Sequence, residues 1–308
     1  MSDAVRVVEV GPRDGLQNEP GSIATATKLE LIDRLAATGL REIEATAFVS
    51  PKWVPQMADH SRLMRRLPRR PGVRYPVLVP NLRGYDAAVS AGATEVAVFA
   101  AASEAFSRRN INCSIDESID RFAPVFEAAA RQGVRVRGHI SCVVACPYEG
   151  AVAPQRVAQV ASRLHEMGSC EITLGDTIGV ATPLPLLRML EAVAARVPIE
   201  RLTGHYHDTW GMAAANVYAS YEFGIRSFDA SVAGLGGCPY AKGATGNVAT
   251  EDLVYLFDGL GVSTGVELAA LVEVAAWICA RLGRAPASRV ARAWLARGGA
   301  ATVKPGGT

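Results

Sequence analysis

Two histidines, His205 and His207, stand one residue apart in a chain that has only five histidines. They belong to a run, 202–209, whose composition predicts a β-strand. Side chains alternate between the two faces of a strand, so His205 and His207 point the same way and Tyr206 points the other way. Neutral imidazoles are common ligands of divalent metals, and the pair therefore indicates a candidate metal site. Two hydrogen-bonded structural histidines beside a cleft would give the same spacing.

The elements that position this pair follow a repeating pattern of short β-rich runs and longer helical stretches. The strand candidates are 5–10, 42–48, 73–79, 95–101, 135–144, 170–174, 202–207 and 227–232. The helix candidates between them include 25–38, 115–131, 154–167, 183–197 and 212–223. A glycine follows most of these helices, as expected where a helix turns into the next strand. Eight βα units predict a parallel sheet, and eight is the number that closes into a (β/α)8 TIM barrel.

An open, doubly wound α/β sheet is the competing arrangement. It predicts a glycine-rich dinucleotide-binding loop after the first strand, whereas the residues after Val10 are Gly-Pro-Arg-Asp-Gly. We therefore expect a catalytic barrel over residues 1–260. Two further helical stretches near 266–282 and 288–297 predict a C-terminal helical extension, 261–298, packed on the barrel, followed by a flexible tail, 299–308.

The composition excludes several classes of partner. The chain has 32 basic and 30 acidic residues, so its net charge of +2 gives no reason to expect nucleic acid or a membrane surface. No uninterrupted apolar stretch reaches the length that spans a bilayer. The six cysteines show no paired spacing and suit free thiols in a reducing compartment. We expect a soluble intracellular protein.

Active-site residues of such a barrel gather at the carboxyl ends of its strands and in the loops that follow them. This chain carries a set of polar residues at these places: Arg13, Asp14, Glu44, Asn110, His139, Asp176, His205, His207, Cys238, Asn247 and Glu251. Charged and polar residues placed at random would not choose this position repeatedly.

Four of these residues form a mixed ligand set. Asp14, His205, His207 and Asn247 offer one carboxylate, two imidazoles and one amide oxygen. The set leaves positions open on an octahedral cation and suits Mg²⁺ or Mn²⁺ with a chelating substrate. Two histidines and one carboxylate could equally form the facial triad of an iron oxygenase. A fourth protein ligand argues against that alternative, because such triads need three open positions.

Arg13 and Cys238 suit the remaining chemistry. Arg13 stands beside Asp14 and can stabilise a developing oxyanion with planar paired donors that stay charged. The alternative is a structural arginine held by Glu44 or Asp176. Cys238 lies in a loop between glycines and a proline, where a mobile thiol could be a proton donor, a nucleophile or neither.

Six segments resemble the 3-hydroxy-3-methylglutaryl-CoA lyase family. They are GPRDGLQN (11–18), FVSPKWVPQM (48–57), NINCS (110–114), CPYEG (146–150), LGDTIG (174–179) and SVAGLGGCPY (231–240). The similarity runs from about residue 5 to residue 292, and the last segment with Gly246-Asn247 is its most specific part. A wider group of metal-dependent barrel lyases and condensing enzymes shares the Arg-Asp pair and the His-x-His spacing.

The resemblance implies cleavage of (S)-3-hydroxy-3-methylglutaryl-CoA to acetoacetate and acetyl-CoA, a step of leucine degradation and ketone-body formation. It implies that Asp14, His205, His207 and Asn247 bind a divalent metal, Mg²⁺ or Mn²⁺, and that Glu251 supports these ligands. Either Asp14 or His205 would receive the proton of the substrate hydroxyl. The sequence does not choose between the two, although a histidine already bound to metal is the poorer base.

The resemblance also implies roles for residues that do not bind the metal. Arg13 matches the arginine that stabilises the enolate, and Cys238 matches the catalytic cysteine of a loop. Glu44 and Asp176 match acidic residues that matter for activity. Asn110 falls where the family contacts CoA.

The partner expected from the resemblance is a small acyl-CoA substrate, and the expected assembly is a homodimer. No mitochondrial leader precedes residue 5 and no peroxisomal ending follows, so we expect a cytoplasmic bacterial enzyme. His139 and Tyr206 differ from the residues of animal members, which bears on the shape of the acyl pocket.

Three competing functions remain at this point. The first is a lyase for a different branched 3-hydroxyacyl-CoA. The second is a Claisen-type condensing transferase, which usually carries an additional C-terminal regulatory domain. The third is a barrel that binds without catalysis, against which the full set of metal and acid residues argues.

Overall fold

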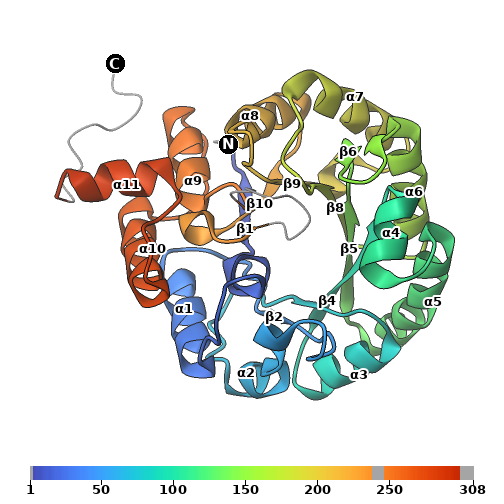
Figure 1. The fold of residues 1–308 in the computed structure, drawn as a ribbon, viewed down its shortest axis with the longest axis horizontal. Coiled ribbons are helices and arrows are strands. Elements are labelled where there is room, and N and C mark those ends of the chain that lie inside the picture. The colour runs from blue at the N-terminus through green and yellow to red at the C-terminus, as the bar shows by residue number, and fades with distance from the viewer. Residues whose placement is uncertain (1–2, 238–245, 299–308) are drawn as a thin grey trace.

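Eight parallel strands form one sheet that curls into a barrel inside a ring of helices (Figure 1). The structure is a computed structural model that describes residues 3–237 and 246–298. The sheet order is β1-β10-β9-β8-β5-β4-β3-β2, and a parallel bridge from Glu9 to Ile43 joins its two ends. The backbone N–H of Glu44 donates to the carbonyl of Glu9 at 2.8 Å across this seam. The predicted (β/α)8 barrel is therefore confirmed.

The barrel strands are β1 (Arg6–Glu9), β2 (Thr46–Ala47), β3 (Val77–Leu78), β4 (Glu95–Ala101), β5 (Arg135–Ser141), β8 (Glu171–Asp176), β9 (Leu202–Tyr206) and β10 (Ser227–Ala230). Between β5 and the next helix, β6 (Ala145–Cys146) and β7 (Gly150–Ala151) form a separate antiparallel hairpin. The sequence pattern did not predict this hairpin.

The strands β2 and β3 are shorter than predicted. An isolated bridge from Glu42 to Arg74 continues the pairing, but the ladder is interrupted before the pair formed by Thr46 and Val77. Pro76 lies in this gap, and because proline has no backbone N–H it cannot donate to the ladder. The predicted run 73–79 is thus only partly a regular strand.

The helices of the described residues are α1 (Thr25–Ala37), α2 (His60–Arg66), α3 (Leu82–Ser90), α4 (Glu104–Ile111), α5 (Ile115–Gln132), α6 (Pro154–Glu166), α7 (Pro183–Ala194), α8 (Ala213–Phe223), α9 (Thr250–Gly259), α10 (Leu268–Leu282) and α11 (Arg289–Ala296). Glycines of positive φ follow several of them, as predicted. At Gly39 a side chain is also excluded by space, because a Cβ would lie 2.1 Å from the carbonyl oxygen of Gly265.

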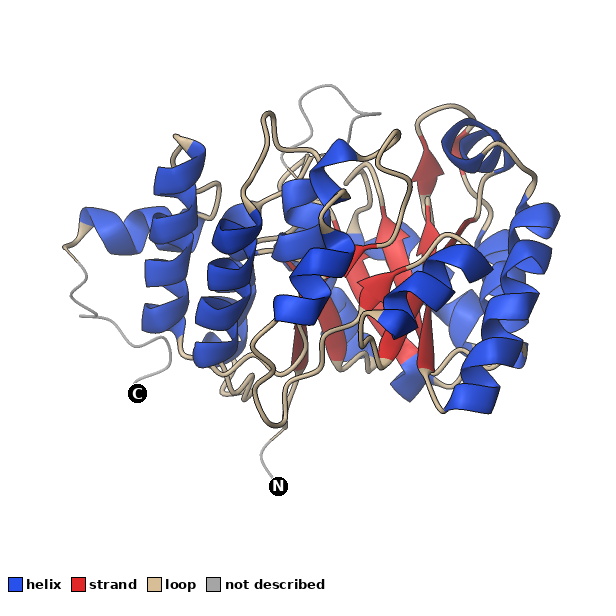
Figure 2. Ribbon diagram, turned by 90° about the horizontal axis from the view of Figure 1, so that it is seen from below, coloured by secondary structure: helices blue, strands red, loops and turns tan. Residues whose placement is uncertain are grey.

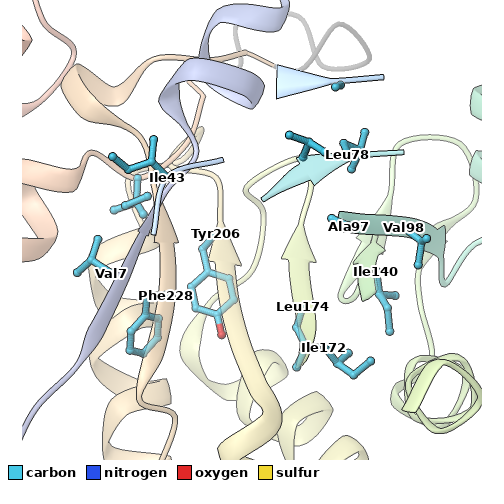
Figure 3. Close-up of a cluster of buried hydrophobic side chains, with 14 of the residues drawn as sticks. Val7, Ile43, Leu78, Ala97, Val98, Ile140, Ile172, Leu174, Tyr206 and Phe228 are labelled. Atoms are coloured by element: carbon cyan, nitrogen blue, oxygen red, sulfur yellow. The ribbon is translucent and has the colours of Figure 1, made fainter. Parts of the chain in front are cut away.

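Apolar side chains fill the layer between the strands and the helices. Figure 3 shows part of this core, with Val7, Leu174, Tyr206 and Phe228 contributed by different strands. Tyr206 points outward as predicted, since its hydroxyl lies 2.9 Å from Ser220 Oγ on α8. His205, which precedes Tyr206 in β9, and His207, which follows it, therefore point the other way, toward the inside of the barrel.

The last helices pack on the rest of the chain. The side view in Figure 2 shows the strands enclosed by helices. The N–H of Glu267, just before α10, donates to the carbonyl of Thr38 at 2.8 Å, and α10 packs beside α1. Buried side chains of α10 such as Leu271 and Ile278 belong to the same apolar cluster as Val7 of β1. Among the described residues, no helix has the length and apolar character needed to cross a membrane.

Candidate metal centre and active site

A single turn of π-helix, η1 (Gly11–Gly15), places Arg13 and Asp14 at the carboxyl end of β1. The carbonyl of Val10 accepts hydrogen bonds from the N–H groups of Asp14 at 2.8 Å and Gly15 at 3.1 Å. A Cβ on Gly15 would lie 2.7 Å from Ser231 Oγ and 2.8 Å from Leu235 Cβ. Glycine at position 15 therefore lets this turn pack closely against the loop after β10.

Arg13 is buried and held by two carboxylates. Its Nε donates to Glu44 Oε2 at 2.7 Å, and its Nη1 donates to Asp14 Oδ1 at 2.6 Å. Burial alone would lower the pKa of Arg13, but Glu44 and Asp14 outweigh it and keep the guanidinium charged. Of the two partners expected from the sequence, Glu44 contacts Arg13, whereas Asp176 is not among its ion pairs in the described residues.

The ligand atoms of Asp14, His205 and His207 all lie within 4.8 Å of one another. The fourth predicted ligand, Asn247, forms an isolated antiparallel bridge with His207 and donates from Nδ2 to Asp14 Oδ2 at 2.9 Å. The fold thus brings all four residues together. Binding a cation through the oxygen of Asn247 would require its amide to turn over. Asn247 lies ahead of α9, which begins at Thr250.

The charges of this cluster fit a divalent cation. Burial alone would raise the pKa of Asp14, but Arg13 and then the two histidines hold it well below its ordinary value, so the carboxylate is ionised. Burial, and then the neighbouring His205, lowers the pKa of His207 to about 4. His207 is therefore neutral near pH 7, as a metal ligand must be, and its buried Nδ1 has no hydrogen-bond partner in the described residues.

Asp229 of β10 is a site residue that the sequence analysis missed. Its Oδ2 lies 3.1 Å from Nδ1 of His205, and the carboxylate is buried. Burial lowers the pKa of His205, but the hydrogen bond and charge of Asp229 outweigh this effect and raise it. A carboxylate on one ring nitrogen of a histidine leaves the other nitrogen for a metal. The signal in the sequence was a charged residue inside the predicted strand 227–232.

Asp176 organises the loop that follows β8. Its carboxylate accepts hydrogen bonds from the N–H groups of Ala181 at 2.9 Å and Val180 at 3.3 Å. Burial raises the pKa of Asp176 to about 6, although these hydrogen bonds oppose the shift. In the same turn Gly179 has a φ of 64°, and a Cβ there would lie 2.7 Å from the carbonyl oxygen of His207. The loop after β8 therefore supports the end of β9 directly.

Two buried glutamates hold the loop after β10, which begins with η4 (Val232–Gly234). Glu251 accepts from the N–H of Ala233 through both oxygens, at 2.8 and 3.0 Å. Glu9 accepts from the N–H groups of Gly11 at 2.7 Å and Val232 at 2.9 Å, and from the hydroxyl of Thr250 at 2.7 Å. Glu251 thus contacts the loop. Glu9 was not predicted from the sequence, where its position inside a strand is its only signal.

Three further residues were predicted for the site, namely Asn110, His139 and Cys238. Asn110 is exposed near the end of α4, beside Arg109, whose guanidinium carbon lies 4.3 Å from the ring centre of Tyr148. His139 lies in β5, and its buried Nε2 has no hydrogen-bond partner in the part of the chain described. Cys238 lies outside the described residues.

Comparison with known proteins gives a consistent set of relatives. The family model described as HMGL-like matches residues 4–278. A Pseudomonas aeruginosa protein named 3-hydroxy-3-isohexenylglutaryl-CoA/hydroxy-methylglutaryl-CoA lyase is 60% identical over 293 residues, which cover 95% of this chain and 98% of that protein.

Solved structures agree. The crystal structure of hydroxymethylglutaryl-CoA lyase from Pseudomonas aeruginosa has a TM-score of 0.94 and 59% identity, covering 96% of this chain and 99% of that chain. A structure of an HMG-CoA lyase from Acinetobacter baumannii, in complex with coenzyme A and 3-methylmalate, has a TM-score of 0.91 and 36% identity. That likeness covers 98% of this chain and 97% of the other.

Proposed function

The chain belongs to the HMGL-like family of carbon–carbon lyases, and we propose that it cleaves (S)-3-hydroxy-3-methylglutaryl-CoA to acetoacetate and acetyl-CoA. The observation that carries this proposal is the convergence of Asp14, His205 and His207, with ligand atoms within 4.8 Å of one another, beside the buried guanidinium of Arg13. The relatives named as lyases of this substrate supply the substrate class.

Asp14, His205, His207 and Asn247 would hold a divalent cation, Mg²⁺ or Mn²⁺. The ionised carboxylate, the neutral His207 and its unpaired Nδ1 support this assignment. Held there, the cation would supply Lewis-acid chemistry that lowers the pKa of the tertiary hydroxyl of the substrate. Asp14 and His205 are the candidate acceptors of the hydroxyl proton. Arg13 makes Asp14 a weak base, and Asp229 occupies one ring nitrogen of His205, so His205 could accept the proton only with its other ring nitrogen off the metal.

Arg13 would stabilise the thioester oxygen as it becomes an enolate. Because Glu44 and Asp14 fix the guanidinium before the substrate arrives, its charge needs no reorganisation during the reaction. Glu44 has a second, buried oxygen without a hydrogen-bond partner among the described residues, so its contact with Arg13 is made by Oε2 alone. Glu44 is thus proposed to position Arg13, and Asp176 to position the turn beside His207.

Cys238 would deliver the proton that converts the enolate into acetyl-CoA. Its place in a glycine-flanked loop and the resemblance of that segment to the family support this role. Asn110 is proposed to contact the CoA portion of the substrate, beside Arg109 and Tyr148.

The setting of the enzyme is proposed from its relatives. The proposed reaction belongs to leucine degradation and ketone-body formation, and a cytoplasmic location is proposed with it. A homodimer is proposed from the family resemblance, and light scattering coupled to gel filtration tests it.

The direct test is a coupled assay for acetoacetate release by metal-stripped protein, with and without Mg²⁺ or Mn²⁺. Turnover that depends on the added metal is expected. Binding of metal without cleavage of this thioester would contradict the proposed substrate and would still support the proposed metal site.

A second candidate is a lyase for a longer branched 3-hydroxyacyl-CoA. It is favoured by the name of the 60% identical Pseudomonas aeruginosa relative, which includes 3-hydroxy-3-isohexenylglutaryl-CoA. A higher kcat/KM on the isohexenyl thioester than on the methyl thioester would select this function.

A further inference from the structure

Arg137 lies on β5 inside the barrel, where it is only 1% exposed. Its guanidinium contacts carboxylates from three other segments of the barrel wall. Nη1 donates to Glu42 Oε1 at 3.1 Å, and Nη2 donates to Glu171 Oε1 at 2.7 Å and to Asp229 Oδ1 at 3.3 Å. Arg137 is thus the centre of a buried ion network in the middle of the barrel.

One member of this network also contacts the proposed metal centre. Asp229 receives Arg137 on Oδ1 and lies 3.1 Å from Nδ1 of His205 through Oδ2. The two oxygens of a single carboxylate therefore connect the buried guanidinium to a proposed ligand. A carboxylate that accepts a hydrogen bond from a charged planar donor on one oxygen keeps one orientation. The imidazole ring that contacts its other oxygen is then fixed as well.

We propose that Arg137 is a positioning residue for the metal centre: it fixes Asp229, which in turn holds His205 with one ring nitrogen directed at the metal. The inference rests on the metal site proposed above. It assigns Arg137 no contact with the substrate or the metal.

A second arginine in the network, Arg6, allows the positioning role of Arg137 to be distinguished from a purely structural role. Glu42 and Glu171 each have a second arginine, since Arg6 donates to Glu42 at 3.0 Å and also to Glu171. Asp229 has no second arginine: among the described residues, Arg137 is its sole arginine partner. Loss of Arg6 removes charge from the same network and leaves the Asp229 contact in place. Loss of Arg137 removes that contact.

The experiment measures Mn²⁺ binding to metal-stripped protein by calorimetry, without substrate. We expect Arg137→Met to weaken Mn²⁺ affinity by about 10- to 100-fold, the range found when a partner of a metal-bound histidine is removed. Arg6→Met is the matched control, because it gives up ion pairs with the same two glutamates. It should bind Mn²⁺ with an affinity close to that of the wild type.

A double-mutant cycle tests the route through Asp229. Asp229→Asn should weaken Mn²⁺ binding by a similar factor, and adding Arg137→Met to that variant should cost less than about twofold more. If Arg137→Met weakens Mn²⁺ binding by the same factor in the wild type and in the Asp229→Asn variant, the role of Arg137 does not run through Asp229 and the inference is contradicted. Circular dichroism confirms that each variant is folded before its affinity is read.

Removal of a buried arginine risks unfolding, and Arg137→Lys then replaces Arg137→Met in the cycle. Its single ammonium keeps the charge but cannot bridge Glu42, Glu171 and Asp229 as the planar guanidinium does, so weaker Mn²⁺ binding is again expected. Wild-type affinity in a folded Arg137 variant would overturn the inference. A wild-type protein that binds no Mn²⁺ would instead contradict the proposed metal site on which the inference rests.

Discussion

Arg13 and Asp14 are adjacent in the sequence and have opposite tasks in the proposed mechanism. The guanidinium lowers the pKa of Asp14 and so keeps a ligand ionised, while Glu44 holds the same guanidinium from the other side. A preorganised charge of this kind stabilises a developing enolate oxygen by a few kcal/mol. At the scale of single residues, Arg13 is the side chain whose removal should separate chemistry from binding.

Arg13→Met should lower kcat by at least about 10²-fold and leave Mn²⁺ affinity largely intact. The physical reason is that Arg13 is not itself a ligand, and that His205 and the bound cation still favour the ionised form of Asp14 when the guanidinium is gone. Steady-state kinetics and calorimetry on the same preparation measure the two effects. Arg70→Met, which removes an exposed guanidinium 2.8 Å from Asp33, serves as the control. Turnover of the Arg13 variant equal to that of the control would remove Arg13 from the chemistry.

The candidate ligands could be predicted from the sequence because the carboxyl ends of parallel strands converge on one place. Asp229 and Arg137 were not predicted. Each is a charged residue inside a predicted strand, but their contact depends on which strands are neighbours and in which register. The strand pattern alone places Asp229 on one face of β10. The pairing of β10 with β9 is what reveals that Asp229 stands opposite His205.

At the scale of elements, the turn after β8 packs against the residues that follow β9. Adding one methyl group to this turn tests whether the contact matters. Gly179 has a φ of 64°, and an added Cβ would lie 2.7 Å from the carbonyl oxygen of His207 and 2.8 Å from the N of Thr209. Gly133, which ends α5 with a φ of 67°, has nothing within 4 Å of such a Cβ. The two glycines share the backbone conformation and differ in what lies beside them.

Gly179→Ala should weaken Mn²⁺ binding by several-fold, since the clash displaces the backbone that carries His207. Gly133→Ala should lose about 1 kcal/mol of stability for the left-handed conformation and keep the affinity of the wild type. Calorimetric titration of both variants with Mn²⁺ makes the comparison. Equal affinities would show that the turn does not position the histidine.

Glu9 connects three elements, namely η1, η4 and α9, and its environment predicts a dependence of stability on pH. Burial raises its pKa from 4.5 to about 7 in the folded chain, against the hydrogen bonds that oppose the shift. The stability that the protonated form contributes is complete below the unfolded pKa and is lost as the pH rises through the folded pKa. The loss is on the order of 3 kcal/mol, because each pKa unit corresponds to about 1.4 kcal/mol.

Glu9→Gln should remove this dependence. The free energy of unfolding of the wild type should fall relative to that of the variant between pH 4.5 and about 7, with a constant difference above that range. Urea unfolding at a series of pH values measures the difference. A difference that does not change with pH would mean that Glu9 has an ordinary pKa in the folded chain.

The elements themselves were largely predictable. The alternation of apolar strand runs and amphipathic helices predicted the barrel, and glycines of positive φ stand after helices where the pattern placed them. The errors have local causes that the pattern does not contain. Pro76 interrupts a ladder, and the hairpin of β6 and β7 consists of two residues on each side, too few for a period to be visible.

At the scale of the whole molecule, α10 shares one apolar core with the barrel. Leu271 is fully buried in α10, whereas Leu295 of α11 is 42% exposed. Leu271→Ala should lower the free energy of unfolding by about 2–5 kcal/mol and keep a single unfolding transition. Leu295→Ala should change it by less than about 0.5 kcal/mol. Differential scanning calorimetry checks both, and a second transition that alone responds to Leu271→Ala would make the C-terminal helices a separate unit.

The central claim concerns the place where the barrel holds its cation, and crystals grown with Mn²⁺ test it most directly. Anomalous scattering of Mn²⁺ should give a peak bounded by Asp14, His205, His207 and Asn247, at the carboxyl ends of the strands. The amide of Asn247 should present its oxygen to that peak. A protein that turns over with Mn²⁺ but shows its anomalous peak elsewhere, with none between these side chains, would contradict the account.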